Sequence, residues 1–386
     1  MKEGSRRTLI QIGLLLLSLG LILVADFSAK QLANRGKKAK PVPAGAESLP
    51  SVSHRQFHPE YHHSFVPNSA GSEAFGPFLT PYFVNSLGMR DAEIRAVFPE
   101  RPPGGRVLLL GDSYMDGVGL GFSQTVAGQM KAILAPLGME ILNGGVASYS
   151  PTLMAARLKS WVEKDGLQFD IAAVFIDISD LDNELRLQRD STGNFLREDN
   201  PAFLSQLEKC KEAVWVRAWM EAQVEKNFVL LGATFRSLRL LYEEWGSPGS
   251  DTPYVFSDWP AYRGPLEPWI EDGIRRQRQA MDQILGLCKK QGARLVVVVY
   301  PWLEQVDRGW LKDRHTRSWE EWAERNQVPF LSLYPDFIER RKSIVDYTLS
   351  ANDGHWNARG CRLVAERLVK FLSERGLLPA ATGRQL

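Results

Sequence analysis

The chain has little of several residue types that would point to a particular class of protein. Among its 386 residues are three cysteines, Cys210, Cys288 and Cys361, which lie far apart and form no Cys-x-x-Cys pair. This spacing argues against a disulfide framework and against a structural zinc site. Lysine and arginine (47) nearly balance aspartate and glutamate (45), so the charge gives no reason to expect a nucleic-acid partner.

Two common enzyme signatures are also missing. The glycines of Gly-Val-Gly-Leu-Gly at 117–121 come late after the preceding apolar run and do not match G-x-G-x-x-G, which argues against a nucleotide-binding Rossmann domain. No G-x-S-x-G is present, so an α/β-hydrolase elbow has no support. Four of the six histidines fall within 54–63, where no helix or strand pattern fixes ligand geometry. We interpret 54–63 as a solvated stalk rather than a metal site, and we predict no metal and no cofactor.

An apolar block stands near the start of the chain. Residues 9–25 are apolar except for Gln11 and Ser18, and their length is at the lower edge of what spans a bilayer as a helix. No small-x-small cleavage site follows, so we expect residues 1–28 to be an uncleaved membrane anchor. A cleaved signal peptide, which would leave a secreted protein, is the alternative. We expect residues 29–79 to be a tether.

From residue 106 onward, short apolar runs alternate with segments of helical spacing. We predict strands over 106–110, 139–145, 169–177, 293–301 and 328–335. We predict helices over 122–138, 150–166, 266–292, 316–327 and 357–376. This alternation predicts a doubly wound, flavodoxin-like α/β fold, a three-layer sandwich with about five parallel strands.

A segment rich in tryptophan and charge interrupts the pattern at about 183–265. We interpret it as a helical insertion at the edge of the sheet, a cap with an ordinary core; a substrate-shaping or partner surface is the alternative. The main domain is expected to cover 80–376, followed by a tail at 377–386.

Three residues that could act together stand at the ends of predicted strands. Ser113, in Gly-Asp-Ser, follows the first strand and lies near the amino end of the next helix, where N–H groups favour negative charge. Asp353 and His355 lie between the last strand and the last helix, at the same edge of the sheet. Nucleophilic acyl transfer needs such a set, because a hydroxyl is inert until an oriented base takes its proton. The alternative is that Asp353 caps a helix and His355 is a surface residue.

These segments resemble the conserved blocks of the SGNH (GDSL-type) hydrolase family, over roughly residues 80–376 apart from the insertion. Gly-Asp-Ser-Tyr-Met-Asp-Gly at 111–117 is similar to the first block, and Asn-Ser-Leu-Gly-Met-Arg-Asp at 85–91 is similar to the lead-in of many bacterial members. The resemblance implies that Ser113 is the nucleophile, His355 the proton relay and Asp353 the residue that orients His355.

The resemblance also implies an oxyanion hole. Asn-Gly-Gly-Val-Ala-Ser-Tyr-Ser-Pro at 143–151 is similar to the second block, and it places Ser148 where the family usually has a glycine N–H donor, beside the N–H of Ser113. The third block, Gly-x-Asn-Asp in the family, reads Asp-Ile-Ser-Asp here. Either the hydroxyl of Ser179 or the side chain of Asn183 would then supply the remaining donor.

The last block, Asp-Gly-His-Trp, resembles the extracytoplasmic acetyltransferase-like branch linked to alginate and peptidoglycan O-acetylation. The resemblance implies a membrane-anchored serine esterase or O-acyltransferase that acts outside the cytoplasmic membrane on acyl (acetyl) esters of an envelope glycan or lipid, in some cases beside a membrane-bound acyl-transfer partner. Basic residues after the apolar block would by themselves favour a cytoplasmic body. A non-catalytic scaffold or binding subunit of an envelope polysaccharide-modification complex is the alternative function.

Overall fold

The centre of the protein is one mixed sheet of eight strands in the order β10-β9-β8-β6-β7-β5-β4-β3. The computed structural model describes residues 54–76, 78–205, 259–260, 265–350 and 353–379. The sheet strands are β3 (Ala70–Phe75), β4 (Phe78–Val84), β5 (Arg90–Asp91), β6 (Arg106–Leu110), β7 (Glu140–Asn143), β8 (Ile171–Ile176), β9 (Arg294–Val299) and β10 (Phe330–Ser332).

The five strands predicted from the apolar runs, β6 to β10, are all parallel to their neighbours in this group. Numbered along the chain, these five lie in the order 2-1-3-4-5, which is the flavodoxin-like order. The predicted fold class is therefore confirmed. The order reverses between β6 and β8, and ligands bind at such a switch point, outside the carboxyl ends of the strands.

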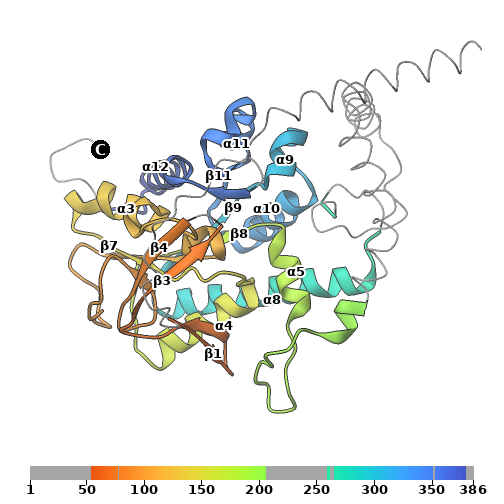
Figure 1. Cartoon of the computed structure of the whole chain (residues 1–386), viewed down its shortest axis with the longest axis horizontal. Coiled ribbons are helices and arrows are strands. Elements are labelled where there is room, and N and C mark those ends of the chain that lie inside the picture. The colour runs from red at the N-terminus through yellow and green to blue at the C-terminus, as the bar shows by residue number, and fades with distance from the viewer. Residues whose placement is uncertain (1–53, 77, 206–258, 261–264, 351–352, 380–386) are drawn as a thin grey trace, which may run out of the picture. The chain divides into compact units, whose positions relative to one another are not determined.

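Helices cover both faces of the sheet (Figure 1). Alternate residues of β6 point to opposite sides: Leu108 and Leu110 pack into one hydrophobic core, and Val107 and Leu109 into the other. The helices are α2 (Ser113–Asp116), α3 (Val126–Leu134), α4 (Pro151–Glu163), α5 (Ser179–Arg186), α8 (Pro268–Lys290), α9 (Leu303–Arg308), α10 (Arg314–Asn326), α11 (Tyr334–Ile338) and α12 (Ala358–Glu374). Short 3-10 turns are η1 (Phe122–Gln124), η2 (Ala135–Leu137) and η3 (Arg341–Asp346).

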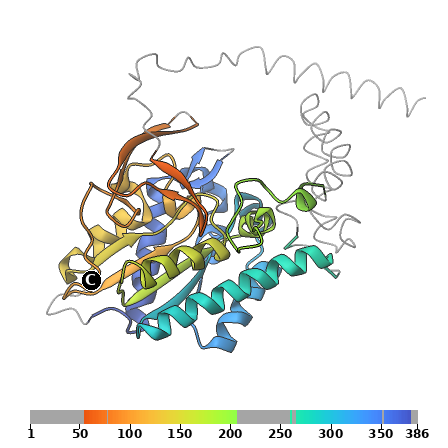
Figure 2. The ribbon, with the colours of Figure 1, turned by 90° about the horizontal axis from the view of Figure 1, so that it is seen from below.

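The helices α4 and α8 run side by side on one face, and α3 and α12 pack together on the other (Figures 1 and 2). The helix predicted over 122–138 is divided into η1, α3 and η2. Its last turn tightens around Pro136, and Gly138 ends it with φ of 65°. The other predicted helices are found with ends shifted by a few residues.

The structure differs from the predicted tether over about its second half. Residues 54–76 form strands: β1 (Arg55–His58) pairs with β2 (His62–Phe65), and β3 pairs with β4 at the edge of the central sheet. The reason lies in the alternation within β4, which buries Thr80, Tyr82 and Val84 while intervening residues face outward. The tether prediction for 54–76 is therefore wrong, and residues 29–53 lie outside the described ranges.

Other predicted boundaries are only partly covered. The start of the predicted insertion at about 183 falls within α5, and the described chain continues to residue 205 with a bridge between Arg189 and Phe195. Residues 206–258, the predicted anchor at 1–28 and residues 380–386 lie outside the described ranges. Within those ranges, no helix combines the length and the apolar character needed to cross a membrane.

Candidate active site

Ser113 is the first residue of α2, directly beyond the carboxyl end of β6. The helix has a single turn, because Gly117 adopts φ of 79° and ends it. Ser113 therefore lies at the amino end of a helix as expected, but the next long helix, α3, begins only at Val126. The carboxyl oxygen Oδ1 of Asp112 accepts the N–H of Tyr114 at 3.0 Å and fixes the start of the turn.

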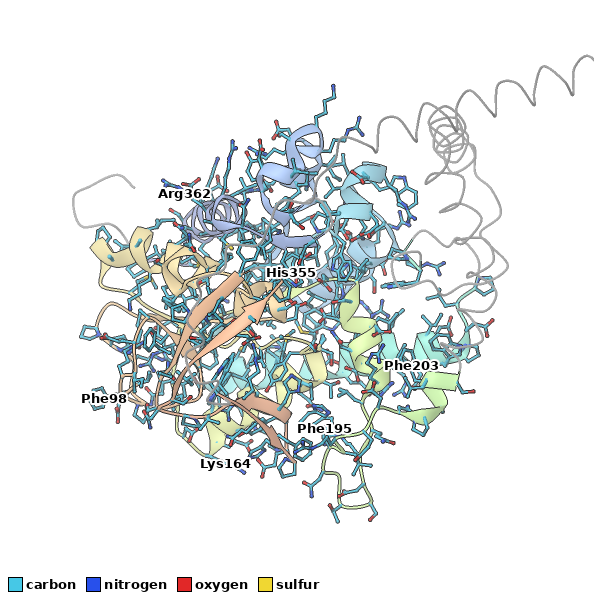
Figure 3. All side chains as sticks on the ribbon, in the orientation of Figure 1. Phe98, Lys164, Phe195, Phe203, His355 and Arg362 are labelled. Atoms are coloured by element: carbon cyan, nitrogen blue, oxygen red, sulfur yellow. The ribbon has the colours of Figure 1, made fainter. Side chains whose placement is uncertain are left out.

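The structure brings Ser113, His355 and Asp353 together. Nε2 of His355 lies 2.8 Å from Oγ of Ser113, and Nδ1 of His355 lies 2.7 Å from Oδ1 of Asp353. Because a carboxylate oxygen accepts, Nδ1 carries the hydrogen and Nε2 is free to accept the Ser113 hydroxyl. The side chains of His355 and Asp353 remain 23% and 31% exposed, so a substrate can reach them. Figure 3 shows His355 beside the ends of β3 and β4.

Asp353 and His355 belong to β12 (Asp353–Trp356), which pairs with β11 (Thr348–Ser350). The alternative that Asp353 caps the last helix is excluded, because the side chain of Asn357 caps α12 by accepting the N–H groups of Arg359 and Gly360. Oδ1 of Asp353 also accepts the backbone N–H of His355 at 3.0 Å. This oxygen therefore holds both the ring and the main chain of His355.

Two aromatic rings fix the His355 ring from different sides. Tyr114 stacks on it with ring centroids 4.6 Å apart, and Phe75, at the end of β3, meets it edge-on at 5.1 Å. Neither contact is predicted from the sequence, because Phe75 falls in the predicted tether and no pattern pairs Tyr114 with His355. The β3–β4 hairpin is thus part of the site.

Ser148 lies in a turn that approaches the nucleophile. The turn is closed by a hydrogen bond from the Tyr149 N–H to the Val146 carbonyl at 3.1 Å, and Ser148 has φ of 65°. A Cβ on Gly145 would lie 2.6 Å from the nitrogen of Asp116, so only glycine permits this close approach of the turn to α2. Ser148 itself is exposed, and its conformation is one that favours glycine, the usual residue of the similar family at this place.

Ser179 and Asn183 are placed differently from what the third-block resemblance implies. The Ser179 hydroxyl donates to Oδ1 of Asp177 at 2.6 Å, and the Ser179 N–H donates to the same oxygen at 2.7 Å. Asn183, one turn further along α5, is half-buried and makes no hydrogen bond with Ser113 within the described residues. In this structure neither side chain is therefore directed to Ser113 by a hydrogen bond.

Three buried carboxyl groups, which the sequence did not single out as a group, lie beneath the strand ends. Burial, with the charge of Asp177, raises the pKa of Asp112 to about 8, and the same two causes raise the pKa of Asp180 well above its usual range. Tyr300 donates its hydroxyl to Asp112 at 2.7 Å, and Trp302 donates its ring N–H to Asp177 at 2.6 Å. Burial therefore favours the protonated form of Asp112, which carries no negative charge beside Ser113.

The lead-in segment at 85–91 supports the nucleophile turn. The fully buried guanidinium of Arg90 donates to the carbonyl oxygens of Asp116 and Gly117, each at 2.7 Å, and also to that of Leu120. From β1, Arg55 bridges Oδ2 of Asp116 at 2.7 Å and Oε2 of Glu73 at 2.8 Å. Arg90 from within the predicted domain and Arg55 from the strand β1 before it therefore both hold α2 in place.

The four histidines of 54–63 do not form one common site, although His62 and His63 contact each other through their Nδ1 atoms, 2.7 Å apart. His54 contacts Glu73, His58 stacks on Tyr61, and Nε2 of His63 lies 2.8 Å from the carbonyl oxygen of Ala147. The stalk interpretation is therefore wrong for these residues. Among the residues that the structure describes, no group of three or more His, Cys, Asp or Glu side chains could hold a metal ion. Cys288 and Cys361 are buried free thiols.

Comparisons with known proteins give only distant likenesses. No protein-family model matches the chain, and no curated protein matches it. Solved structures that are similar include a lipolytic protein of the G-D-S-L family from Desulfitobacterium hafniense (10% identity, 69% of this chain, 99% of that chain, TM-score 0.37). They also include a G-D-S-L family member from Veillonella parvula (11% identity, 69% of this chain, 98% of that chain, TM-score 0.37). A third is an acetylxylan esterase from Geobacillus stearothermophilus (14% identity, 70% of this chain, 94% of that chain, TM-score 0.36).

Two of these descriptions name the G-D-S-L family, which the sequence blocks of this chain resemble. At these identities and TM-scores, the likeness says nothing about which reaction this chain performs. Its fold is given by its own strand pairing, and its chemistry must be inferred from its own side chains.

Proposed function

We propose that this protein is a serine esterase or O-acyltransferase that works through an acyl-Ser113 intermediate. The observation that carries the proposal is the chain of contacts from Asp353 through His355 to Ser113, with heavy-atom distances of 2.7 and 2.8 Å. These are hydrogen-bonding distances for a nucleophile, a base and the group that orients the base. A scaffold would have no need of this alignment.

In the first half of the reaction, Oγ of Ser113 attacks the ester carbonyl carbon while its proton passes to Nε2 of His355. The carbonyl oxygen becomes an oxyanion, for which the N–H groups of Ser113 and Ser148 are the proposed donors. When the intermediate collapses, the bond to the alcohol oxygen breaks, and the alcohol leaves with the proton from Nε2. An acyl-Ser113 ester remains.

In the second half, His355 takes a proton from an acceptor hydroxyl, and the acceptor oxygen attacks the acyl carbon. The bond to Oγ breaks, and the proton returns from Nε2 to Oγ. A water acceptor makes the protein an esterase, and a sugar hydroxyl makes it an O-acyltransferase. Asp353 keeps the ring of His355 in one tautomer and stabilises its charged form in both halves.

The proposed substrate is a cell-envelope glycan or lipid outside the cytoplasmic membrane that carries an ester-linked acyl group. The acyl group that we propose is acetyl. Two features of the sequence support this proposal: the apolar block at 9–25 and the resemblance of Asp-Gly-His-Trp to the extracytoplasmic O-acetylation branch. A membrane-bound protein that delivers acyl groups is the partner that a transferase of this kind would need. A reporter enzyme that is active only outside the cytoplasm, fused after Leu386, tests the location.

The activity is tested with the full-length protein and a short-chain chromogenic acetyl ester, with and without an oligosaccharide acceptor. We expect release of the chromogenic alcohol from the wild type and a loss of at least ~10³-fold in Ser113→Ala. Acetylated oligosaccharide in the products would identify a transferase, and free acetate alone would identify an esterase. Equal turnover by wild type and Ser113→Ala would refute the proposal, and no turnover together with no serine labelling would favour the scaffold.

A further inference from the structure

The turn that carries Ser148 is held from two sides. On one side, the N–H of Ala147 donates to Oδ2 of Asp116 at 3.2 Å. On the other side, Nε2 of His63, in β2, lies 2.8 Å from the carbonyl oxygen of Ala147, and the Tyr149 hydroxyl donates to the carbonyl oxygen of His63 at 2.5 Å. The two peptide groups that flank Ala147 are therefore both fixed by residues outside the turn.

The form of this turn is unusual for its sequence. Val146 to Tyr149 is a β-turn in which Ser148, at the third position, has a positive φ and Ala147, at the second, does not. This combination defines a type II turn, whose third position favours glycine. Serine has a lower conformational energy in a type I turn. In a type I turn the central peptide, between Ala147 and Ser148, has the opposite orientation to that in a type II turn.

The direction of this central peptide decides where the Ser148 N–H points. In a trans peptide the C=O and N–H groups point in opposite directions, and the described residues contain no cis peptide. When the Ala147 carbonyl oxygen is hydrogen-bonded on one side of the turn, the Ser148 N–H therefore points to the opposite side. If the peptide turned over, a carbonyl oxygen would replace the N–H donor.

We propose that His63 is a positioning residue for the oxyanion hole: by binding the Ala147 carbonyl oxygen, it keeps the Ser148 N–H directed at the reacting carbonyl. This inference rests on the proposed function, because it gives Ser148 its role as an oxyanion donor. It gives a role to one histidine of the segment at 54–63, none of whose histidines takes part in the proposed acyl transfer itself.

The surroundings of His63 fit a fixed donor. A carbonyl oxygen can only accept, so Nε2 of His63 must carry a hydrogen. Nδ1 of His63 lies 2.7 Å from Nδ1 of His62, which can supply the hydrogen for that contact. Burial, with the nearby charge of Arg55 and His62, lowers the pKa of His63 to about 4, so the ring is neutral at neutral pH. The competing view is that the ring only fills space against Tyr149, whose ring centroid lies 5.0 Å away.

A variant pair separates hydrogen bonding from packing. His63→Phe keeps a ring against Tyr149 and removes the donor, whereas His63→Gln offers an amide N–H near the position of Nε2. We expect kcat for the chromogenic ester to fall about 10- to 100-fold in His63→Phe, with KM changed less than about threefold, and His63→Gln to recover most of the loss. His58→Phe, in the paired strand β1, is the control and is expected to leave kcat unchanged.

The Ser148→Gly background provides the sharper comparison. Glycine adopts a positive φ without penalty, so the type II turn no longer depends on His63. Adding His63→Phe to Ser148→Gly is therefore expected to lower kcat by less than about threefold, a smaller loss than the same substitution causes in the protein with Ser148. A loss as large as in the serine background would overturn the inference, because a packing role does not depend on the residue at position 148.

Crystal structures of the wild type and His63→Phe test the inference without relying on activity. We expect the Ala147 carbonyl to face His63 in the wild type and the central peptide to be turned over in a large fraction of the His63→Phe molecules. An unchanged peptide in His63→Phe would contradict the inference whatever the activity. If the wild type neither hydrolyses esters nor reacts with a fluorophosphonate, the proposed function fails, while the peptide direction still decides whether His63 controls the turn.

Discussion

Nε2 of His355 lies 2.8 Å from Oγ of Ser113, although 242 positions separate the two residues in the chain. Ser113 is brought there by the end of a central parallel strand, and His355 by a two-stranded hairpin that precedes the last helix. The contact therefore depends on the complete sheet. From it we derive predictions about the role of the carboxylate behind His355, the buried acids beneath Ser113 and the residues that surround both.

Asp353→Asn is expected to lower kcat for an acetyl ester by about 10³- to 10⁴-fold at neutral pH. The amide has no negative charge to stabilise a charged His355 ring, and its NH2 group can donate to Nδ1 and so favour the wrong tautomer. Steady-state hydrolysis across pH 6 to 9 measures the loss. Asp346→Asn, at an exposed position paired with Arg359, is the matched control and is expected to keep full activity. A loss of less than tenfold in Asp353→Asn would mean that another group orients His355.

Asp112→Asn is expected to flatten the dependence of stability on pH. Because the pKa of Asp112 is raised to about 8 in the folded protein, above its value in the unfolded chain, the protonated form stabilises the fold below pH ~4 and this contribution is lost as the pH rises through 8. Asparagine keeps an oxygen that can accept from Tyr114 and Tyr300 and does not titrate. Thermal unfolding at pH 5, 6.5 and 8 measures the difference. The Tm of the wild type should fall further than that of the variant; parallel curves would show that Asp112 is ionised in the folded protein throughout this range.

Ser179→Ala is expected to change kcat by less than about fivefold. The Ser179 hydroxyl is already bound to Asp177 at 2.6 Å, so its loss removes a local hydrogen bond worth about 1 kcal/mol of stability rather than an oxyanion donor. Parallel measurements of kcat and Tm distinguish the two effects. If the variant instead turned over the ester about two orders of magnitude more slowly, the hydroxyl would have to turn to the substrate during the reaction.

Phe75→Ala is expected to lower kcat/KM about tenfold, because the His355 ring loses the edge contact that limits its movement. Phe83→Ala, on the outward side of β4 and 37% exposed, is the control for general damage to the β3–β4 hairpin. Hydrolysis of the chromogenic ester by both variants measures the effect. Equal activity of Phe75→Ala and the wild type would show that Tyr114 and Asp353 suffice to hold the ring.

The sequence predicts the parts of the protein that are governed by local patterns. Runs such as Arg-Val-Leu-Leu-Leu at 106–110 are apolar on both faces because helices cover both sides of a parallel sheet, so they identify the central strands. A residue that directly follows such a strand, as Ser113 does, is then placed at the binding edge by the fold alone. Asp353 and His355 follow less directly from this reasoning: they lie between the last central strand and the last helix, as the sequence indicates, but a separate hairpin of β11 and β12 carries them to this edge.

Contacts made between distant and irregular segments are not predictable in this way. The strand Ala70–Phe75 has no clear alternation of buried and exposed residues, so it reads as tether, although it pairs with β4 as the edge strand of the central sheet. The role of His63 depends on the direction of one peptide group in another segment. The third block is recognisable as unusual, but the burial that raises the pKa of Asp112 and Asp180 depends on how the ends of β6, β8 and β9 pack together.

The most direct test of the proposed chemistry is to map the site of covalent labelling on the full-length protein. The wild type is treated with a fluorophosphonate, digested, and examined by mass spectrometry, beside His355→Asn and the control His58→Phe. We predict a single phosphonylated serine, Ser113, with labelling slowed at least ~100-fold in His355→Asn and unchanged in His58→Phe. Labelling at another residue, or at Ser113 with the same rate in His355→Asn, would contradict the proposal that His355 activates Ser113 for acyl transfer.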